Sequence, residues 1–436
     1  MPAYVGSILH LASNFFGKRK VGFSKSVRIV SPKRWGVDAP PFYVYPCPKY
    51  PSITARWIMH KPVHFSRRDF IKVAGFGLGA LAFRRTGTTA SPRLLPQFPA
   101  GDLLGRVAVT PNFYSTELKP QPDENATKIR DVGQDEIVVW QREVVGTSVS
   151  GRTNRRWAET PDGFIYAVDL QPVRNISNNP AGSLPAGKSG FWAEVTVPYV
   201  DLQIQNSPIS PGVKFTLQTN QPMRLYYGQV VWIDQVGGDG AGNVLYRVNE
   251  APQHGYGYGD VFLADATAFH LLTNEDVAPI SPNVDPNTKK IIIDATPGRQ
   301  TLSCFEGNSE VYFCRVSTGY GDQFSTPVGD QAIAWKIFSI HMAANTGSDS
   351  GYDTMAVPWP VFFNTNAGAA IHGAFWHNDF GVRRSHGCVN VSPEDAKWIY
   401  RWTSPALTLD QSEWRGTWPN VGGQYSTSVT VDETKV

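Results

Sequence analysis

Short runs of alternating apolar and polar residues dominate the chain beyond residue 100 and predict β-strands rather than long helices. The stretches 136–140 (Glu-Ile-Val-Val-Trp) and 156–159 (Arg-Trp-Ala-Glu) are examples. Pro161-Asp-Gly163 marks a tight turn, after which Phe164-Ile-Tyr166 predicts another strand. Strands this short and this closely spaced are typical of a small β-barrel, which we expect over residues 101–175.

A second stretch repeats this pattern and predicts a second small barrel over residues 189–276. Val138-Val-Trp140 reappears 92 residues later as Val230-Val-Trp232. Both stretches resemble bacterial Src-homology-3-like barrels, through positions that are mostly apolar. The resemblance implies modules that bind the cell wall or orient a substrate, but rigid spacers with aromatic cores would show the same pattern.

A third segment begins after the Pro-containing linker 280–286 and is expected to span residues 288–412. Lys289–Asp294 and Gln300–Phe305 predict paired strands, with Glu306-Gly-Asn-Ser309 as the hairpin turn. We expect this segment to fold without the barrels, because it contains its own predicted strands and hairpin. The alternative is that the second barrel packs against the segment and forms one wall of its groove, an arrangement that the short linker would allow.

One short helix is expected in this third segment. Ser392-Pro-Glu-Asp395 has an N-cap serine, a proline at the first position and acids in the first turn, and we expect the helix to end near Trp402. It follows Val389-Asn-Val391, which predicts a strand. The predicted fold class is therefore mainly β: two small β-barrel modules followed by a mixed β-rich domain with a short helix after Cys388.

The composition supports ordered domains and places the positive charge at one end of the chain. The 436 residues are 41% hydrophobic and 18% charged, which argues against disorder. Residues 1–90 carry a net charge of +13, and the remaining 346 residues carry −10. An acidic body lacks the surplus of Lys and Arg that neutralises phosphates, so we expect no nucleic-acid partner.

The basic N-terminal segment contains a pattern that resembles a twin-arginine (Tat) export signal. Ser66-Arg-Arg-Asp-Phe-Ile-Lys72 precedes the apolar run Val73–Phe83, which is shorter than the roughly 20 residues of a membrane span. A buried helix with a basic start is the alternative. The resemblance implies a signal peptide at 59–90 and an exported protein at the cell wall, with membrane contact only through the uncleaved signal. Met59, seven residues before Ser66, would then be the first residue, and 1–58 would be a lead segment that is either not translated or disordered.

The candidate chemistry lies around one cysteine. Cys388 follows His386 by two residues and His372 by sixteen. A thiol with a pKa of about 8.5 is mostly protonated at neutral pH, so a nucleophilic cysteine needs a neighbouring imidazole. Gly387 removes side-chain bulk, which lets backbone N–H groups approach a carbonyl oxygen as an oxyanion hole.

Ser385-His-Gly-Cys-Val-Asn390, preceded by a distant histidine, resembles the catalytic motif of L,D-transpeptidases of the YkuD type. Thr326-Pro-Val-Gly329 and Val316-Ser-Thr-Gly319 match two further segments of that family, and the likeness covers about residues 288–410. Twelve residues separate His372 from the motif, a slightly shorter loop than in the mycobacterial type. That departure concerns the shape of the substrate entrance.

The resemblance implies a role for each residue of the motif. Cys388 would be the nucleophile and His372 the base that takes its proton, while His386 would shape the loop by hydrogen bonding. The backbone N–H groups of Gly387 and Cys388 would stabilise the oxyanion. Ser385 and Asn390 would also fix the loop, and His377 could line the groove. The candidate substrate-binding residues are Ser385, Arg384, Asn390 and Trp376.

The family's reaction implies peptidoglycan stem peptides as partners, carbapenem-type inhibitors and no cofactor. The cysteine would attack the carbonyl of the third residue of a donor stem, release D-alanine and leave a thioester. An amine from a neighbouring stem would then form a cross-link between third residues. With water as acceptor the activity would be that of an L,D-carboxypeptidase, and with a protein amine it would attach a protein to the wall.

Three other classes of function compete with this interpretation. A zinc hydrolase could use His372, His377, His386 and Cys388, but the chain has no His-Glu-x-x-His motif, and we expect no metal. Papain-like peptidases place the cysteine before the histidine, which is the opposite order. A non-enzymatic wall-binding protein would leave a cysteine beside two histidines unexplained.

The other cysteines leave one question open. Cys304 and Cys314 lie on the two arms of one predicted hairpin, so they form either a cross-strand disulfide or two separate buried thiols. Cys47 would be lost with the leader.

Overall fold

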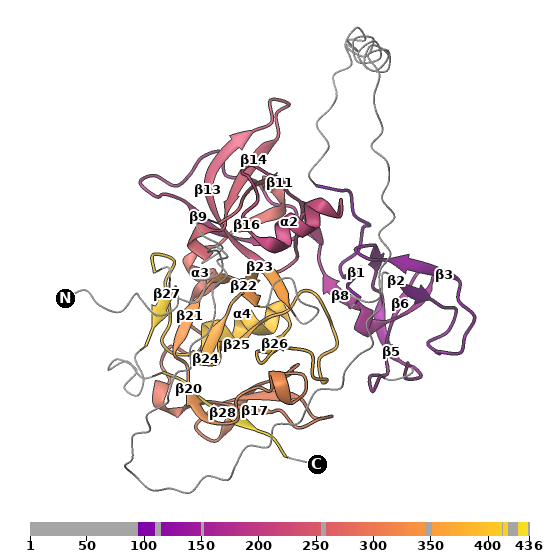
Figure 1. Cartoon of the computed structure of the whole chain (residues 1–436), viewed down its shortest axis with the longest axis vertical. Helices are drawn as coiled ribbons and strands as arrows, with labels where there is room; N and C mark the ends of the chain where they lie inside the picture. Colours follow the sequence, from indigo (N-terminus) through magenta and orange to yellow (C-terminus); the bar gives the residue numbers. More distant parts are fainter. Residues whose placement is uncertain are drawn as a thin grey trace, which may run out of the picture. The chain divides into compact units, whose positions relative to one another are not determined.

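Short antiparallel strands make up most of the structure, and the fold is mainly β, as the alternating pattern predicts (Figure 1). The predicted lead segment, signal peptide and Cys47 lie outside the described residues. Within the described part of the chain, no helix has the length and apolar character needed to cross a membrane. The computed structural model describes residues 95–109, 115–149, 152–253, 259–344, 351–411, 413–416 and 426–434.

The first module, residues 101–175, contains two three-stranded sheets and one hairpin. Its strand β1 is buried along its whole length, between β4 and β8. The predicted turn joins β6 and β7, where Gly163 has a φ of +144° and a Cβ would lie 2.4 Å from the carbonyl oxygen of Lys119. The elements are β1 (Leu104–Val107), β2 (Ser115–Leu118), β3 (Arg130–Gly133), β4 (Ile137–Val139), β5 (Arg142–Val145), β6 (Arg156–Thr160), β7 (Gly163–Tyr166), η1 (Ala167–Asp169) and β8 (Leu170–Val173).

The second module, residues 189–276, centres on a six-stranded antiparallel sheet in the order β11-β15-β14-β13-β9-β16. Helix α2 is an element that the strand pattern did not predict. It starts at Ser210, whose hydroxyl accepts a hydrogen bond from the N–H of Val213, and Pro211 follows. The elements are β9 (Phe191–Val195), β10 (Tyr199–Asp201), β11 (Gln203–Ile204), α2 (Pro211–Gln218), β12 (Arg224–Tyr226), β13 (Val230–Gly238), β14 (Val244–Asn249), η2 (Ala251–Gln253), β15 (Val261–Asp265), η3 (Ala266–Ala268), β16 (Phe269–Leu271) and α3 (Asn274–Val277).

The third segment, from residue 286 onward, contains two five-stranded sheets, in the orders β19-β18-β17-β28-β20 and β26-β25-β24-β21-β27, and the hairpin β22-β23. Each sheet draws a strand from beyond residue 412, the end expected from the sequence: β28 pairs with β17 and β27 with β21. The elements are η4 (Pro286–Thr288), β17 (Lys289–Asp294), β18 (Thr301–Glu306), β19 (Ser309–Arg315), η5 (Asp322–Phe324), β20 (Gly329–Ala332), β21 (Trp335–Ile337), β22 (Ser339–Ala344), β23 (Tyr352–Pro358), β24 (Val361–Asn364), β25 (Ala369–Gly373), β26 (Val389–Val391), α4 (Pro393–Trp402), β27 (Glu413–Arg415) and β28 (Ser428–Asp432).

Helix α4 starts and ends where the sequence predicts. The Ser392 hydroxyl accepts a hydrogen bond from the N–H of Asp395 and caps the first turn. At the other end, the fully buried ammonium group of Lys336 donates to three backbone carbonyl oxygens at 2.8 to 2.9 Å. Burial lowers the pKa of Lys336, and the three carbonyls satisfy its three donors. The strand that follows the cysteine is therefore held against a helix closed at both ends.

The second module and the third segment share one hydrophobic core. Trp192 and Val230 of the module lie in the same buried cluster as Ile291 and Val389 of the third segment. The ring centroids of Trp192 and Phe338 lie 5.5 Å apart. This junction is packed like a protein interior. It therefore supports the alternative in which the second barrel packs against the third segment, rather than the expectation that the segment folds without it.

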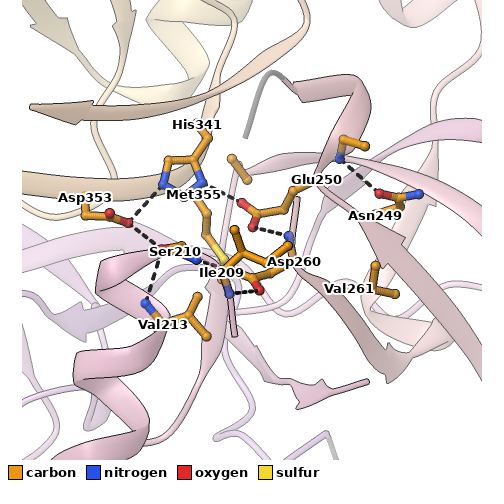
Figure 2. A network of polar contacts seen from close by, with 12 residues as sticks. Ile209, Ser210, Val213, Asn249, Glu250, Asp260, Val261, His341, Asp353 and Met355 are labelled. Atoms are coloured by element: carbon orange, nitrogen blue, oxygen red, sulfur yellow. Dashed lines mark hydrogen bonds and ion pairs between the residues drawn. The ribbon is translucent and has the colours of Figure 1, made fainter. Parts of the chain in front are cut away.

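A buried polar network also joins the second module to the hairpin β22-β23 (Figure 2). His341 of β22 lies between two carboxylates, with Nδ1 2.8 Å from Glu250 and Nε2 2.9 Å from Asp353. Asp353 accepts a further hydrogen bond from the hydroxyl of Ser210, the N-cap of α2. Burial would lower the pKa of His341, but the hydrogen bonds and charges of the two carboxylates raise it to about 9. At neutral pH the side chain is therefore a cation that ties the hairpin to the module.

Candidate active site

Strand β26, at one edge of the sheet β26-β25-β24-β21-β27, and its neighbour β25 bring together His372 and Cys388, the predicted dyad. Strands β25 and β26 run parallel, with His372 opposite Asn390 and Ile371 opposite Val389. Cys388 directly precedes β26, and the same register places it beside Ala370, two residues before His372 on β25, so the two side chains share one face of the sheet. Fifteen residues separate these strands in the chain, yet the sheet makes the two side chains neighbours in one groove.

That groove has a volume of about 950 Å³. Its wall combines the third segment with Val109 and Gln134 of the first module and Tyr226 of the second. The hairpin β22-β23 adds Tyr352 and Thr354. The predicted site residues that line the groove are His372, Trp376, His377, Arg384, Ser385, His386, Cys388 and Asn390.

His372 has the protonation state that a general base requires. Its side chain is buried, and its Nδ1 lies 3.1 Å from the carbonyl oxygen of Gly373. A carbonyl oxygen only accepts, so Nδ1 carries the hydrogen and Nε2 keeps a free lone pair. Burial lowers the pKa of His372 to about 4, so the ring is neutral at neutral pH.

Cys388 is partly exposed and rests as a thiol. Burial of the sulfur raises its pKa to about 11, against a smaller lowering by a backbone hydrogen bond from Ala370. Its Sγ lies 3.6 Å from the carbonyl oxygen of Gly368, an acceptor for the S–H. The dyad is therefore a neutral thiol beside a neutral imidazole rather than a preformed ion pair.

Ser385 closes the turn that carries the cysteine. Its hydroxyl donates to the carbonyl oxygen of Cys388 at 2.5 Å and accepts the N–H of Gly387 at 3.1 Å. Gly387 has a φ of +117°, which other residues rarely adopt. The glycine is thus needed for the backbone turn. Its N–H is taken by Ser385, so this geometry differs from the expected oxyanion role for Gly387, and the N–H of Cys388 remains the candidate donor.

His386 is exposed and makes ring contacts rather than the expected hydrogen bonds. The centroid of its ring lies 4.6 Å from that of Phe324 and 5.0 Å from that of Tyr352. It therefore connects the cysteine turn to the hairpin β22-β23 by packing.

His377 has a structural position. Its Nδ1 accepts the N–H of Asp379 at 3.2 Å, so its Nε2 must carry the hydrogen. The side-chain amide of Asn390 lies 3.1 Å from Nε2, and turning that amide so that Oδ1 faces the N–H supplies a partner for a buried oxygen that otherwise has none. Burial, followed by the charges of Arg384 and His372, lowers the pKa of His377 to about 3. The ring is bound at both nitrogens.

Arg384 is already paired. Its Nε and Nη2 both donate to the carboxylate of Asp379, and the side chain is about a third exposed. Asp379 is buried and was not singled out in the sequence, where an acid two residues after His377 is the only signal. Trp376 is half-buried, with its ring centroid 5.8 Å from that of His372.

The two upstream segments that match the family, Val316–Gly319 and Thr326–Gly329, directly support the turn that carries Cys388. Ser317 and Asn390 exchange two backbone hydrogen bonds of 2.9 Å each. At Gly319 a Cβ would lie 1.8 Å from the carbonyl oxygen of Phe324, so only glycine fits. The N–H of Gly319 donates to the hydroxyl of Thr326 at 2.9 Å.

Among the residues with described positions, the other cysteines and histidines do not form a second centre. Across the residues that the structure describes, no group of three or more His, Cys, Asp or Glu side chains is arranged to hold a metal. Cys304 and Cys314 are buried free thiols on neighbouring strands, and burial raises the pKa of both. Of the two alternatives for this pair, the structure has the separate thiols.

Residues 288–423 match the family model of the L,D-transpeptidase catalytic domain, YkuD. A comparison with curated proteins found no match. The family model thus assigns an L,D-transpeptidase catalytic domain to the third segment, which contains both strands of the dyad.

Similar solved structures include a Cys-to-Ser mutant of the Enterococcus faecium L,D-transpeptidase, which is 17% identical with a TM-score of 0.25 over 33% of this chain and 50% of that chain. An L,D-transpeptidase from Mycobacterium smegmatis is 15% identical with a TM-score of 0.26, over 44% and 91%. An L,D-transpeptidase in complex with imipenem is 15% identical with a TM-score of 0.26, over 45% and 98%. The chain spans about half the length of the Enterococcus faecium chain.

Proposed function

We propose that this chain is an exported peptidoglycan L,D-transpeptidase, which forms cross-links between third residues of stem peptides through a thioester on Cys388. One observation carries the proposal: in the segment that matches the L,D-transpeptidase catalytic domain, His372 lies on β25, Cys388 directly precedes the parallel neighbour β26, and both side chains line one groove. The reaction needs a nucleophile and a base side by side, and the groove has room for a peptide.

The resting protonation states define the order of proton transfers. The Cys388 sulfur attacks the carbonyl carbon of the third residue, and its proton passes to Nε2 of His372. His372 returns this proton to the leaving nitrogen of D-alanine as the C–N bond breaks and the thioester remains. The acceptor amine then attacks the thioester, gives a proton to His372, and the sulfur leaves and is protonated again.

The surrounding residues would position the nucleophile and the substrate. Ser385 holds the turn that presents Cys388, and the N–H of Cys388 would donate to the oxyanion. Asn390 of β26 and His377 hold each other in place through the contact between the amide group and Nε2 of the ring. Trp376 faces the groove and would contact the stem peptide, whereas Arg384 would act on substrate only together with its partner Asp379.

The acceptor decides which product forms. An amine from a second stem gives a cross-link, water gives L,D-carboxypeptidase activity, and a protein amine would attach a protein to the wall. Peptidoglycan lies outside the cytoplasm, so the proposal includes export through the Tat-like segment 59–90. Carbapenems, whose strained carbonyl resembles an acyl donor, would acylate the same sulfur.

The test is incubation of the mature protein with purified muropeptides, with products read by mass. We expect loss of D-alanine and a cross-linked dimer from the wild type, and neither from Cys388→Ala. Carbapenem should add its mass only to the peptide that contains Cys388. A Cys388→Ala protein with normal turnover would exclude the mechanism.

The pH dependence tests the base. Because the pKa of His372 is about 4, the rate of acylation should be flat near neutral pH and fall below about pH 4, where the protonated ring cannot accept a proton. His372→Ala should lose roughly 10²- to 10⁴-fold in rate and regain part of it as the pH rises towards the pKa of the thiol. His377→Ala should lose much less, and equal losses would contradict the assignment.

A further inference from the structure

The loop 374–380 leads from the strand of His372 towards the cysteine turn, and the first module holds it at two points. The guanidinium Nη2 of Arg106 donates to the backbone carbonyl oxygen of Phe375 at 2.5 Å. The side-chain amide of Asn378 donates to the carbonyl oxygen of Ala167 at 2.9 Å. Both contacts are buried and join residues more than 200 positions apart in the chain.

Arg106 is built into its position. It is 1% exposed, and besides the Phe375 carbonyl its donors reach Gln171 at 2.9 Å and Asp135 at 2.5 Å. Its guanidinium carbon lies 4.0 Å from the centroid of the Tyr226 ring. A buried charge is costly unless it is paired and hydrogen-bonded in several directions. Here each of the three guanidinium nitrogens donates a hydrogen bond to a different partner, so the guanidinium has one orientation and fixes the carbonyl that it binds.

The second module completes this support from the other side. The ring of Tyr226 stacks on that of Phe375, with centroids 5.5 Å apart and an interplanar angle of 22°. The hydroxyl of Tyr226 lies 3.1 Å from Asp135, the same carboxylate that pairs with Arg106. The peptide of Phe375 is thus enclosed by Arg106 at its carbonyl and by Tyr226 at its side chain.

The loop lies directly beside the base of the proposed function, His372. Phe375 lies three residues after His372, and its neighbour Trp376 lines the groove and contacts the His372 ring. A shift of the Phe375 carbonyl would turn Trp376 and the end of β25, and with them Nε2 of His372. A displacement of about 1 Å in a catalytic group can cost about a hundredfold in rate.

We propose that Arg106 is a positioning residue for the catalytic base, so that the first module completes the active site rather than only carrying it to the wall. The inference rests on the proposed function in one respect, because it takes His372 as the base. It assigns to an N-terminal module a role in the rate of acylation even for a small β-lactam that makes no use of wall binding.

The test compares Arg106→Gln with Arg224→Gln in the full mature protein. Arg224 is a matched control, because it pairs with the same Asp135 at 2.9 Å, while its other hydrogen bond goes to Asp201 rather than to the loop. The rate of carbapenem acylation at Cys388 is measured by mass across pH. We expect Arg106→Gln to be about 10- to 100-fold slower near neutral pH, with part of the loss recovered at alkaline pH, and Arg224→Gln to stay within about threefold of the wild type. Equal slowing in the two variants would show a general effect on stability and overturn the proposal.

A second readout does not depend on activity. Amide hydrogen exchange of residues 374–380 should be faster in Arg106→Gln than in the wild type or Arg224→Gln, and unchanged exchange would overturn the proposal. Asn378→Ala tests the other contact of the same loop if Arg106→Gln does not fold, with the same two expected changes. A wild-type protein that is not acylated at Cys388 would refute the proposed function, whereas the exchange data would still decide whether Arg106 positions the loop.

Discussion

The two N-terminal modules contact the third segment by different kinds of interaction. The second module contributes apolar side chains such as Trp192 and Val230 to the core around Ile291. The first module forms its own core around Leu118 and Trp140, and its two contacts with the loop 374–380 are hydrogen bonds from side-chain donors to backbone carbonyl oxygens.

This difference separates stability from geometry. Removing apolar area from water is the main source of folding free energy, and it is tolerant of direction. A hydrogen bond contributes only about 1 kcal/mol net, but it specifies distance and angle. The second module should therefore determine whether the third segment folds, and the first should determine how accurately its catalytic loop is placed.

The largest expected effect is the removal of both modules. A chain that starts near Pro286 would expose the surfaces that Trp192 and Val230 cover and would lose the carboxylate partner of His341 at Glu250. We expect it to be insoluble or to unfold without cooperativity, as judged by circular dichroism during heating. A soluble, cooperatively folded fragment that reacts with carbapenem at the rate of the full chain would show that the modules are only tethers.

Substitution of one shared core residue should give the next largest effect. Trp192→Ala should lower the free energy of unfolding by about 3 to 5 kcal/mol, because it leaves a large cavity between the second module and Phe338. Phe313→Ala is the control, since that side chain is 57% exposed and should change stability little. Urea denaturation measures both. An equal, small change in the two variants would mean that the junction is not a true core.

The charged network in Figure 2 should make the same junction sensitive to alkaline pH. The pKa of His341 is raised to about 9 in the folded protein, above the ordinary histidine value of about 6.5. Its contribution to stability is therefore complete below about pH 6.5 and is lost as the pH rises through about 9, with a total of at most about 3 kcal/mol. His341→Gln should flatten this dependence in urea denaturation, and an unchanged slope between pH 6.5 and 9 would contradict a charged His341.

The sequence predicts those features that depend on local signals. The helix Pro393–Trp402 follows from a capping serine and a proline, and the hairpin between β18 and β19 follows from its turn residues. The same Ser-Pro signal at Ser210 marks helix α2, which the strand pattern obscured. The sequence also pairs His372 with Cys388, because Ser385–Asn390 forms one continuous motif, and the structure brings both side chains into one groove, while their chemical role stays a prediction.

Contacts across long stretches of chain have no such signal. Nothing near Arg106 indicates that its partner is a backbone carbonyl 269 residues away, since any peptide presents the same carbonyl. The strand β28 is equally hidden, because its place beside β17 depends on the whole sheet. The hydrogen bond from Gly387 to Ser385 depends on a turn that only the folded loop defines. What remained unpredicted is therefore the support around the dyad rather than the dyad itself.

The smallest expected effect concerns an exposed ion pair at the junction of the second module with the third segment. Lys188 lies 2.6 Å from Asp410, but their side chains are 56% and 78% exposed, so water and salt screen the attraction. Lys188→Ala should lower the free energy of unfolding by less than about 1 kcal/mol, and the difference should disappear in high salt.

The matched comparison is Lys397→Ala, because Lys397 lies 2.6 Å from Glu194 across the same junction with side chains only 22% and 15% exposed. Its loss leaves a half-buried carboxylate without its cation, so Lys397→Ala should be clearly more destabilising and less sensitive to salt. Equal effects of the two variants in urea denaturation would mean that burial does not control the strength of charged contacts at this junction, and that the shared apolar core alone holds the two parts together.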